Sequence, residues 1–251
     1  MYPKLFGIID SYAVMVILGI ALAVLVFSLY FLKKVKLSKI ELIDLLIVCV
    51  VTLFVGIISA CLFENVYEWI EKQAIKWTWG MTFYGGLIGG IVAFLLMYFF
   101  YYKKRHKDIF DQILIIVPGC ITLAHGVGRI GCFLSGCCYG KITDSWIGVT
   151  FQNVEGRRIP TQLIEAIFLF ILTALLLIFA FKNITKYTMI IYIMSYAIFR
   201  FVIEFFRDDP RGVAFALSPS QIWCIVLFVL SIPCIFIFRK FIFSKNETCK
   251  N

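Results

Sequence analysis

The sequence predicts an all-α integral membrane protein with seven transmembrane helices. Of its 251 residues, 62% are hydrophobic and 16% are charged, whereas soluble domains average roughly 45–50% and about 25%. The hydrophobic residues also form uninterrupted runs of roughly 20 residues, the length that a helix needs to cross about 30 Å of hydrocarbon. These two observations exclude a soluble fold. Solid apolar runs, in place of alternating apolar and polar residues, exclude an outer-membrane β-barrel.

Seven apolar runs are long enough to be considered as spans. The fourth is the least apolar, because Asp111 and Gln112 lie near its start. No small-residue cleavage site follows the first run, so we expect a retained helix and not a removed signal peptide. The expected spans are residues 12–32, 41–63, 82–102, 109–125, 161–181, 187–206 and 218–238. We expect them to form a single membrane domain over residues 1–251.

The basic residues orient these spans. Lysine and arginine are concentrated in alternate connections, at residues 33–39, 103–107, 182–186 and 239–250. Short basic connections lie in the cytoplasm, which places the N-terminus outside and the C-terminus inside. Most of the net charge of +9 is then explained by basic residues that orient the spans and contact anionic lipid. We therefore expect no nucleic acid partner.

The sixth span carries three charged residues, Arg200, Glu204 and Arg207. Spacings of four and seven residues place all three on one helical face. One reading is an ion pair within the helix. The other is an arginine held by a glutamate so that it presents a fixed cation to a phosphate. Charged groups inside a membrane are costly, so both readings mark this face as a functional candidate.

Two other spans begin with polar or small residues. The fifth begins at Pro160, with Gln162 and Glu165 one turn apart, which fits either a polar helix start or the wall of a polar cavity. The third begins GMTFYGGLIGG, whose glycines favour close helix packing. Tyr84 in this segment is a candidate to face a polar cavity.

The segment HGVGRIGCFLSGCCYG, residues 125–140, is the most unusual part of the chain. Its G-x-G-x-x-G spacing does not indicate dinucleotide binding, because no βαβ unit surrounds it. We expect residues 126–160 to form a glycine- and cysteine-rich segment at the outer face. Irregular backbone at membrane depth must be buried in protein or line a cavity, and its free N–H groups beside Arg129 would bind an anion.

Cys132, Cys137 and Cys138 are clustered in this segment. Plain packing, a disulfide and a metal site remain open, and packing is favoured because the spacing is not a familiar zinc pattern. We accordingly expect neither a metal nor a cofactor. β-forming residues in 141–159 predict a small hairpin.

Together these residues predict one site near the outer face. Two arginines at the depth of the lipid headgroups favour a phospholipid as the substrate. The residues expected to converge are Arg129, Arg200, Arg207, Glu204, Glu165, His125 and Tyr84.

At these residues the sequence resembles the bacterial prolipoprotein diacylglyceryl transferase family, over essentially the whole chain. The segments that carry the resemblance are DSYAVMVILG, GMTFYGGLIGG, HGVGRIGCFLSGCCYG, RIPTQLIEA, FRFVIEFFR and SPSQI. The resemblance implies transfer of the diacylglyceryl group of phosphatidylglycerol to the lipobox cysteine in the signal peptide of a prolipoprotein. It also implies a multi-pass protein of the bacterial cytoplasmic membrane, in contact with membrane lipids, with its active site toward the outer leaflet.

The resemblance and the residues considered above together give the expected roles. Catalytic roles are expected for Arg129, Arg200, Glu204, His125 and Tyr84. Substrate-binding roles are expected for Tyr12, Gly85, Gly86, Gly128, Gly131, Gly140, Gln162, Glu165 and Arg207.

The chain departs from the family pattern at three positions. Tyr84 replaces a frequent histidine, Cys132 an asparagine and Cys137 an acidic residue. We hypothesise that His125 replaces the missing histidine as the base, because it is the only other imidazole on the outer side.

Two other functions compete with this one. The same arginines would suit a non-catalytic membrane protein that binds or transports an anionic lipid or solute, and the cysteine changes would suit a transferase acting on another acceptor. A thiol–disulfide protein built on Cys137 and Cys138 is disfavoured, because adjacent cysteines form a bridge only with strain.

Overall fold

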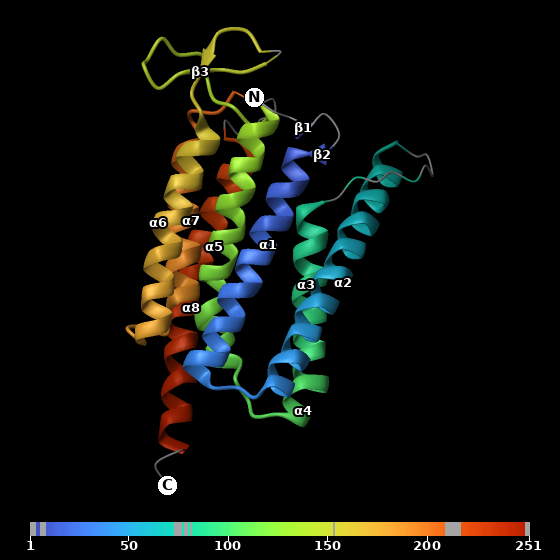
Figure 1. Ribbon diagram of the computed structural model, residues 1–251, viewed down its shortest axis with the longest axis vertical. Helices are drawn as coiled ribbons and strands as arrows, with labels where there is room; N and C mark the ends of the chain where they lie inside the picture. The colour runs from blue at the N-terminus through green and yellow to red at the C-terminus, as the bar shows by residue number, and fades with distance from the viewer. Residues whose placement is uncertain are drawn as a thin grey trace. The chain divides into compact units, whose positions relative to one another are not determined.

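The computed structural model describes residues 4–5, 9–72, 77, 80, 82–152, 154–208 and 217–248 (Figure 1). Seven long helices dominate this described part of the chain. They are α1 (Ser11–Tyr30), α2 (Lys39–Lys72), α3 (Phe83–Met97), α5 (Phe110–Ser135), α6 (Thr161–Lys182), α7 (Thr188–Glu204) and α8 (Pro219–Thr248). Shorter elements are η1 (Phe31–Val35), η2 (Tyr98–Tyr102), α4 (Lys103–Arg105) and the two-residue strands β1 (Lys4–Leu5), β2 (Ile9–Asp10), β3 (Val149–Thr150) and β4 (Arg157–Arg158).

Among the residues that the structure describes, five helical segments are long and apolar enough to cross a membrane. They are Ser11–Val35, Lys39–Ile70, Gly85–Arg105, Phe110–Ser135 and Thr161–Lys182. Large apolar side chains cover their outward faces, as at Ile17 (68% exposed) and Ile70 (72% exposed), which suits contact with lipid. The predicted all-helical membrane class is confirmed. The number of spans and their orientation stay predictions.

The chain forms two compact units. The first combines Met1–Tyr30 with Phe110–Asn251, and the second is the continuous segment Phe31–Ile109. Each unit is considered by itself below. The expected single membrane domain stays a prediction.

In the second unit, α2 packs along α3 through small residues. A Cβ atom on Gly89 would lie 2.3 Å from Ser59, and a Cβ atom on Gly56 would lie 3.4 Å from the carbonyl oxygen of Gly86. The Ser59 hydroxyl also donates a hydrogen bond to the carbonyl oxygen of Gly85 (2.8 Å). The close packing predicted for these glycines is confirmed.

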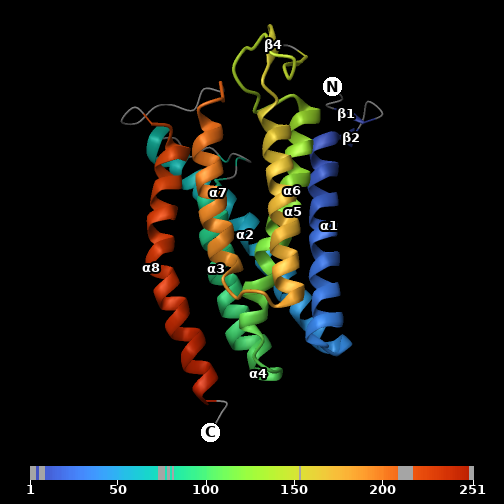
Figure 2. The same cartoon turned by 90° about the vertical axis from the view of Figure 1, so that its left-hand side faces the viewer.

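In the first unit, α5 packs between α1 and α6 (Figures 1 and 2). A Cβ atom on Gly19 of α1 would lie 2.9 Å from the carbonyl oxygen of Ala124 on α5. On the other side of α5, the buried hydroxyl groups of Thr122 and Thr173 are 2.8 Å apart. α7 in turn packs against α8.

The prediction of irregular backbone from residue 126 is wrong. α5 continues through the glycines to Ser135, so their N–H groups lie within the helix and do not form an anion-binding loop. The glycines instead let neighbouring helices approach: a Cβ atom on Gly126 would lie 2.9 Å from the Phe170 ring, and one on Gly131 would lie 3.0 Å from Met15. Close packing against α6 and α1 therefore offsets the low helix propensity of glycine.

Irregular backbone begins only after α5. Strands β3 and β4 pair antiparallel in this segment, which confirms the predicted hairpin within 141–159. An isolated bridge joins Gly140 to Arg207 just after α7, and another joins Ile142 to Arg158. The segment between α5 and α6 is thus tied to the end of α7.

The two helical glycines Gly19 and Gly128 allow a matched test of this packing. Gly19→Ala should destabilise the protein by about 1–3 kcal/mol, because its Cβ meets backbone atoms that cannot rotate away. Gly128→Ala should not, since no described atom lies within 4 Å of its Cβ position, and alanine favours a helix by about 1 kcal/mol. Thermal unfolding in detergent measures both. Equal shifts in the two midpoints would contradict the contact between α1 and α5.

Candidate functional site: buried arginines and carboxylates

The first part of the site is built around Glu165, which is fully buried in the second turn of α6. Its Oε1 lies 2.9 Å from Nη2 of Arg129 on α5. The same oxygen accepts a hydrogen bond from the Tyr196 hydroxyl on α7 (3.0 Å). One carboxylate therefore joins three helices, as a buried charge requires partners of opposite charge or hydrogen-bond donors.

His125 lies one turn before Arg129 on the same face of α5. Its Nε2 is 3.7 Å from the Oε1 of Glu165, beyond hydrogen-bonding distance, and its side chain is 30% exposed. Its ring meets the ring of Tyr196 edge to face, with centroids 5.4 Å apart. The imidazole is thus placed beside the ion pair while part of it stays accessible.

The second part of the site is built around Glu204 at the end of α7. Its Oε2 lies 2.8 Å from Nη2 of Arg200 and 4.0 Å from Nε of Arg207. The intrahelical pair predicted for Arg200 and Glu204 is confirmed. The prediction that Arg207 shares their helical face is wrong, because α7 ends at Glu204 and Arg207 pairs with Gly140 as a bridge.

Tyr196 links the two parts, because it lies one turn before Arg200 and bonds to Glu165. It interacts electrostatically with both Arg129 and Arg200. Sequence reasoning missed this residue. Its position four residues before Arg200, on the polar face of the sixth span, was the available signal.

The charged groups of the site are arginines and glutamates. Three guanidinium groups, of Arg129, Arg200 and Arg207, face two carboxylates, of Glu165 and Glu204. Within the described residues, Nε of Arg129 and Nη1 of Arg200 are buried and have no hydrogen-bond partner. Buried donors are normally satisfied, so these two donors indicate a site for an anion.

Several predicted substrate-binding residues hold the protein itself together. The amide of Gln162 donates to the carbonyl oxygen of Cys137. The Gly140 N–H donates to the carbonyl oxygen of Ile159 (2.8 Å), and a Cβ atom on Gly140 would lie 2.6 Å from the carbonyl oxygen of Phe206. Their roles toward a substrate stay predictions.

The remaining predicted residues lie on different elements. Tyr12 is 45% exposed in the first turn of α1, and its ring would lie 3.3 Å from a Cβ atom on Gly131. Gly128 has open space beside it among the described atoms. Gly85 and Gly86 pack against α2 in the second unit. Tyr84 lies in the first turn of α3, and its side chain is outside the described residues.

Three thiols lie at the end of α5. The Sγ atoms of Cys132, Cys137 and Cys138 are all within 4.8 Å of one another. Hydrogen bonds from the other two thiols, with the Arg207 guanidinium nearby, hold the pKa of the Cys138 thiol well below its usual range. Hydrogen bonds with the thiols of Cys132 and Cys138 raise the pKa of the Cys137 thiol.

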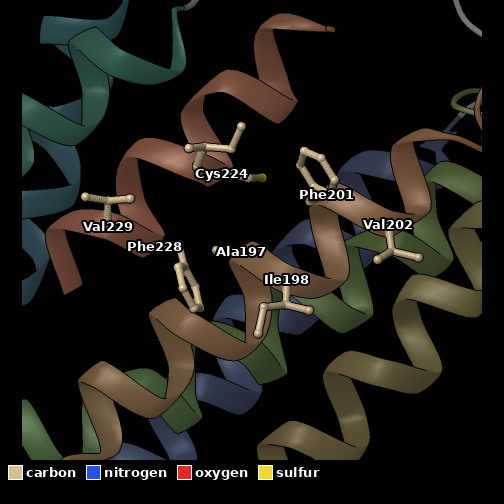
Figure 3. A pocket seen from close by; sticks show the side chains of 8 residues that line it. Ala197, Ile198, Phe201, Val202, Cys224, Phe228 and Val229 are labelled. Atoms are coloured by element: carbon tan, nitrogen blue, oxygen red, sulfur yellow. The ribbon is translucent and has the colours of Figure 1, made fainter. Parts of the chain in front are cut away.

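An apolar groove of about 230 Å³ lies between α7 and α8 (Figure 3). One of its lining residues, Cys224, interacts electrostatically with Arg200 and Glu204, so the groove adjoins the second part of the site. Its lining residues are Ala197, Ile198, Phe201, Val202, Cys224, Ile225, Phe228 and Val229. An apolar groove beside an anion site fits an amphipathic anion.

Fold and site together define a multi-pass membrane protein whose buried arginine donors and adjoining apolar groove suit an anionic, lipid-like molecule. The model of the prolipoprotein diacylglyceryl transferase family matches residues 4–237. Among similar proteins, the phosphatidylglycerol–prolipoprotein diacylglyceryl transferase of Clostridium tetani is 35% identical over 252 aligned residues, which cover 97% of this chain and 98% of that protein.

Two further relatives agree. Transferase 2 of this type from Clostridium perfringens is 35% identical over 240 residues, or 90% of each chain. The transferase of this type from Dehalococcoides mccartyi is 29% identical over 244 residues, covering 93% of this chain and 90% of its own length. The chain belongs to the prolipoprotein diacylglyceryl transferase family. The resemblance stated from its motifs is confirmed.

The buried carboxylate allows a direct test of the first part of the site. Glu165→Gln should destabilise the protein by about 3–5 kcal/mol, because it leaves the Arg129 guanidinium buried without its counter-charge. Thermal unfolding in detergent measures the loss. The control is Glu155→Gln, at an exposed residue between β3 and β4, which should leave the midpoint unchanged. Equal midpoints for the two variants would mean that Glu165 does not stabilise this group.

Proposed function

We propose that this enzyme transfers the diacylglyceryl group of phosphatidylglycerol to the lipobox cysteine of a prolipoprotein, using the arginines described above. The observation that carries the proposal is the pair of buried donors on Arg129 and Arg200 that lack partners among the described residues. Two such donors suit the oxygens of one phosphodiester.

In the reaction, the sulfur of the acceptor cysteine attacks the glyceryl carbon that bears the phosphate. A C–S bond forms as the C–O bond breaks, and the electron pair of that bond leaves on the phosphate oxygen. The leaving group is glycerol 1-phosphate. Its phosphate gains negative charge in the transition state, so Arg129 and Arg200 bind it more strongly there than in the ground state.

The acceptor must react as a thiolate, so its proton needs a base. We assign this role to His125, whose side chain is partly exposed beside the arginines. A neutral imidazole takes the proton, and the resulting cation lies 3.7 Å from the Glu165 carboxylate, which would stabilise it. Tyr196 and Glu165 position Arg129, and Glu204 positions Arg200.

The groove between α7 and α8 would hold part of an acyl chain. Its lining side chains are apolar, and it lies beside Arg200 and Glu204. A lipid bound there would place its phosphate at the arginines and its chain against α7 and α8. Gly128 would leave room for the headgroup, since no described atom lies within 4 Å of its Cβ position.

The basic connections support seven spans with the N-terminus outside and the C-terminus in the cytoplasm. This orientation puts the ends of α5 and α7 that carry the arginines toward the outer leaflet of the bacterial cytoplasmic membrane. The signal peptide of an exported precursor and phosphatidylglycerol would both reach the site there.

The arginine site is tested by a transfer assay in proteoliposomes with phosphatidylglycerol and a lipobox peptide, followed by mass spectrometry of the peptide. Arg129→Ala and Arg200→Ala should each lower kcat/KM by at least about 10²-fold, because each removes a donor to the developing charge. The control is Arg157→Ala, whose guanidinium donates hydrogen bonds to the carbonyl oxygens of Gly148 and Trp146 in its own hairpin.

A diacylglyceryl mass gain with the wild type and the control, but not with the site variants, is the expected result. A folded wild type that binds the lipid without modifying any cysteine peptide would favour the alternative, a protein that binds or transports an anionic lipid. Full activity of both arginine variants would contradict the site itself.

The two histidines of the chain provide a matched test of the base. His125→Gln should lower kcat by about 10²–10⁴-fold, the contribution typical of a general base. His106→Gln should not, because that imidazole pairs with Asp44 (2.7 Å) in the second unit. Normal turnover of His125→Gln in the same transfer assay would remove the assignment.

A further inference from the structure

The three thiols of Cys132, Cys137 and Cys138 have no part in the transfer reaction, yet they meet at one point. Cys132 lies in the last turn of α5, and the other two follow in the turn after it. Their Sγ atoms are within 4.8 Å of one another. Three residues so close in sequence reach one point only if the backbone reverses sharply between them.

The backbone does so by two unusual conformations. Gly136 has φ +73° and Cys138 has φ +63°, and the second is a conformation that residues with a Cβ atom rarely adopt. The Cys137 N–H donates to the carbonyl oxygen of Cys132 (3.1 Å), which closes the turn. Strained backbone of this kind persists where surrounding structure holds it and is concentrated at functional sites.

Helix α6 holds this turn from outside. The Thr161 hydroxyl donates to the carbonyl oxygen of Cys138 (2.8 Å), and the Gln162 amide donates to that of Cys137. Thr161 and Gln162 are both buried. The main chain of the two cysteines is therefore fixed before any ligand arrives, which leaves their side chains directed toward Cys132.

We propose that Cys132, Cys137 and Cys138 bind one thiophilic divalent metal ion of the Zn²⁺ type. Zn–S bonds of about 2.3 Å in a tetrahedral site place sulfur atoms about 3.8 Å apart. The present separations of up to 4.8 Å need only a contraction of about 1 Å, within reach of side-chain rotation. This site is separate from the transfer reaction and does not depend on the proposed function.

Charge also favours an ion here. Three thiolates and one divalent ion carry a net charge of −1, and the Arg207 guanidinium lies beside Cys138 to compensate it. Cys132 and Cys138 also interact electrostatically with the Arg129 guanidinium. A low-charge complex next to two arginines costs less to bury than an isolated ion.

The three cysteines differ in their exposure to solvent. Cys132 is buried, Cys138 is half-buried and Cys137 is exposed, so an ion would enter from the side of Cys137. Among the described residues, no fourth histidine, cysteine, aspartate or glutamate belongs to the cluster. Water would take the fourth position, as in other zinc sites with three protein ligands.

A disulfide is the competing use of these thiols. It would join only two of the three sulfur atoms, and a bridge between the adjacent Cys137 and Cys138 would be strained. The convergence of all three sulfur atoms within 4.8 Å of one another favours the ion.

The test uses the full-length protein, reduced with a phosphine and freed of metal in detergent. Co²⁺ is the spectroscopic probe, and we expect sulfur-to-cobalt charge-transfer absorption that Zn²⁺ abolishes, with one Zn²⁺ ion bound per chain by elemental mass spectrometry. Single Cys→Ser changes at positions 132, 137 and 138 should each weaken Zn²⁺ binding at least tenfold. Cys120→Ser, at a buried thiol on the same helix outside the cluster, should leave it unchanged.

Folded, reduced wild type that shows no thiolate absorption with Co²⁺ would overturn the proposal, whatever happens to the variants. So would Zn²⁺ binding that is the same in all three variants as in Cys120→Ser. Peptide mapping that finds two of the three cysteines joined, in protein isolated from cells with thiols blocked at lysis, would also overturn it in favour of a disulfide.

Discussion

The rest of the site depends on one buried carboxylate. Glu165 is wholly removed from solvent, and an isolated charge in such a place would cost several kcal/mol. It is tolerated because Arg129 and the Tyr196 hydroxyl share its Oε1. Since these groups come from α5, α6 and α7, the need to satisfy one charge determines how three helices meet.

That arrangement determines what the arginines can do. Arg129 pairs with Glu165 through one nitrogen, and Arg200 pairs with Glu204 through one nitrogen. Each guanidinium is therefore held in a single orientation. The donors that remain are fixed in place before a substrate binds. Stabilisation of charge by groups that need no reorganisation is generally the largest contribution to catalysis of this kind. In the proposed reaction the carboxylates therefore contribute by holding the arginines in place.

Sequence patterns were sufficient where the interaction is local. The Arg200–Glu204 pair follows from a spacing of four residues in one helix, and the packing of α2 on α3 follows from closely spaced glycines. They placed Glu165 in the same site as Arg129 but did not predict which groups it pairs with, because these lie on other helices and no spacing reveals which helices are neighbours. Tyr196 was overlooked although its spacing of four residues from Arg200 placed it on the polar face.

The glycine-rich motif misled for a different reason. Glycines predict irregular backbone when they are considered by propensity, but in α5 they are helical because Met15 and Phe170 occupy the space that their side chains would fill. Tertiary packing overrides propensity here. Arg207 shows the reverse: a helical spacing predicted a shared face, but α7 ends three residues earlier.

The division of the chain has a consequence for biosynthesis. The first unit is interrupted by the whole of Phe31–Ile109, so α1 leaves the ribosome long before α5, the helix on which it packs. Chains emerge from the ribosome N-terminus first. Because α1 is apolar on every side, it can lie in lipid before α5 has been made. Arg129 then enters the membrane before Glu165, and Glu165 before Tyr196. The ion pair of Arg129 and Glu165 therefore cannot form until α6 has been made, and its hydrogen bond from Tyr196 cannot form until α7 follows.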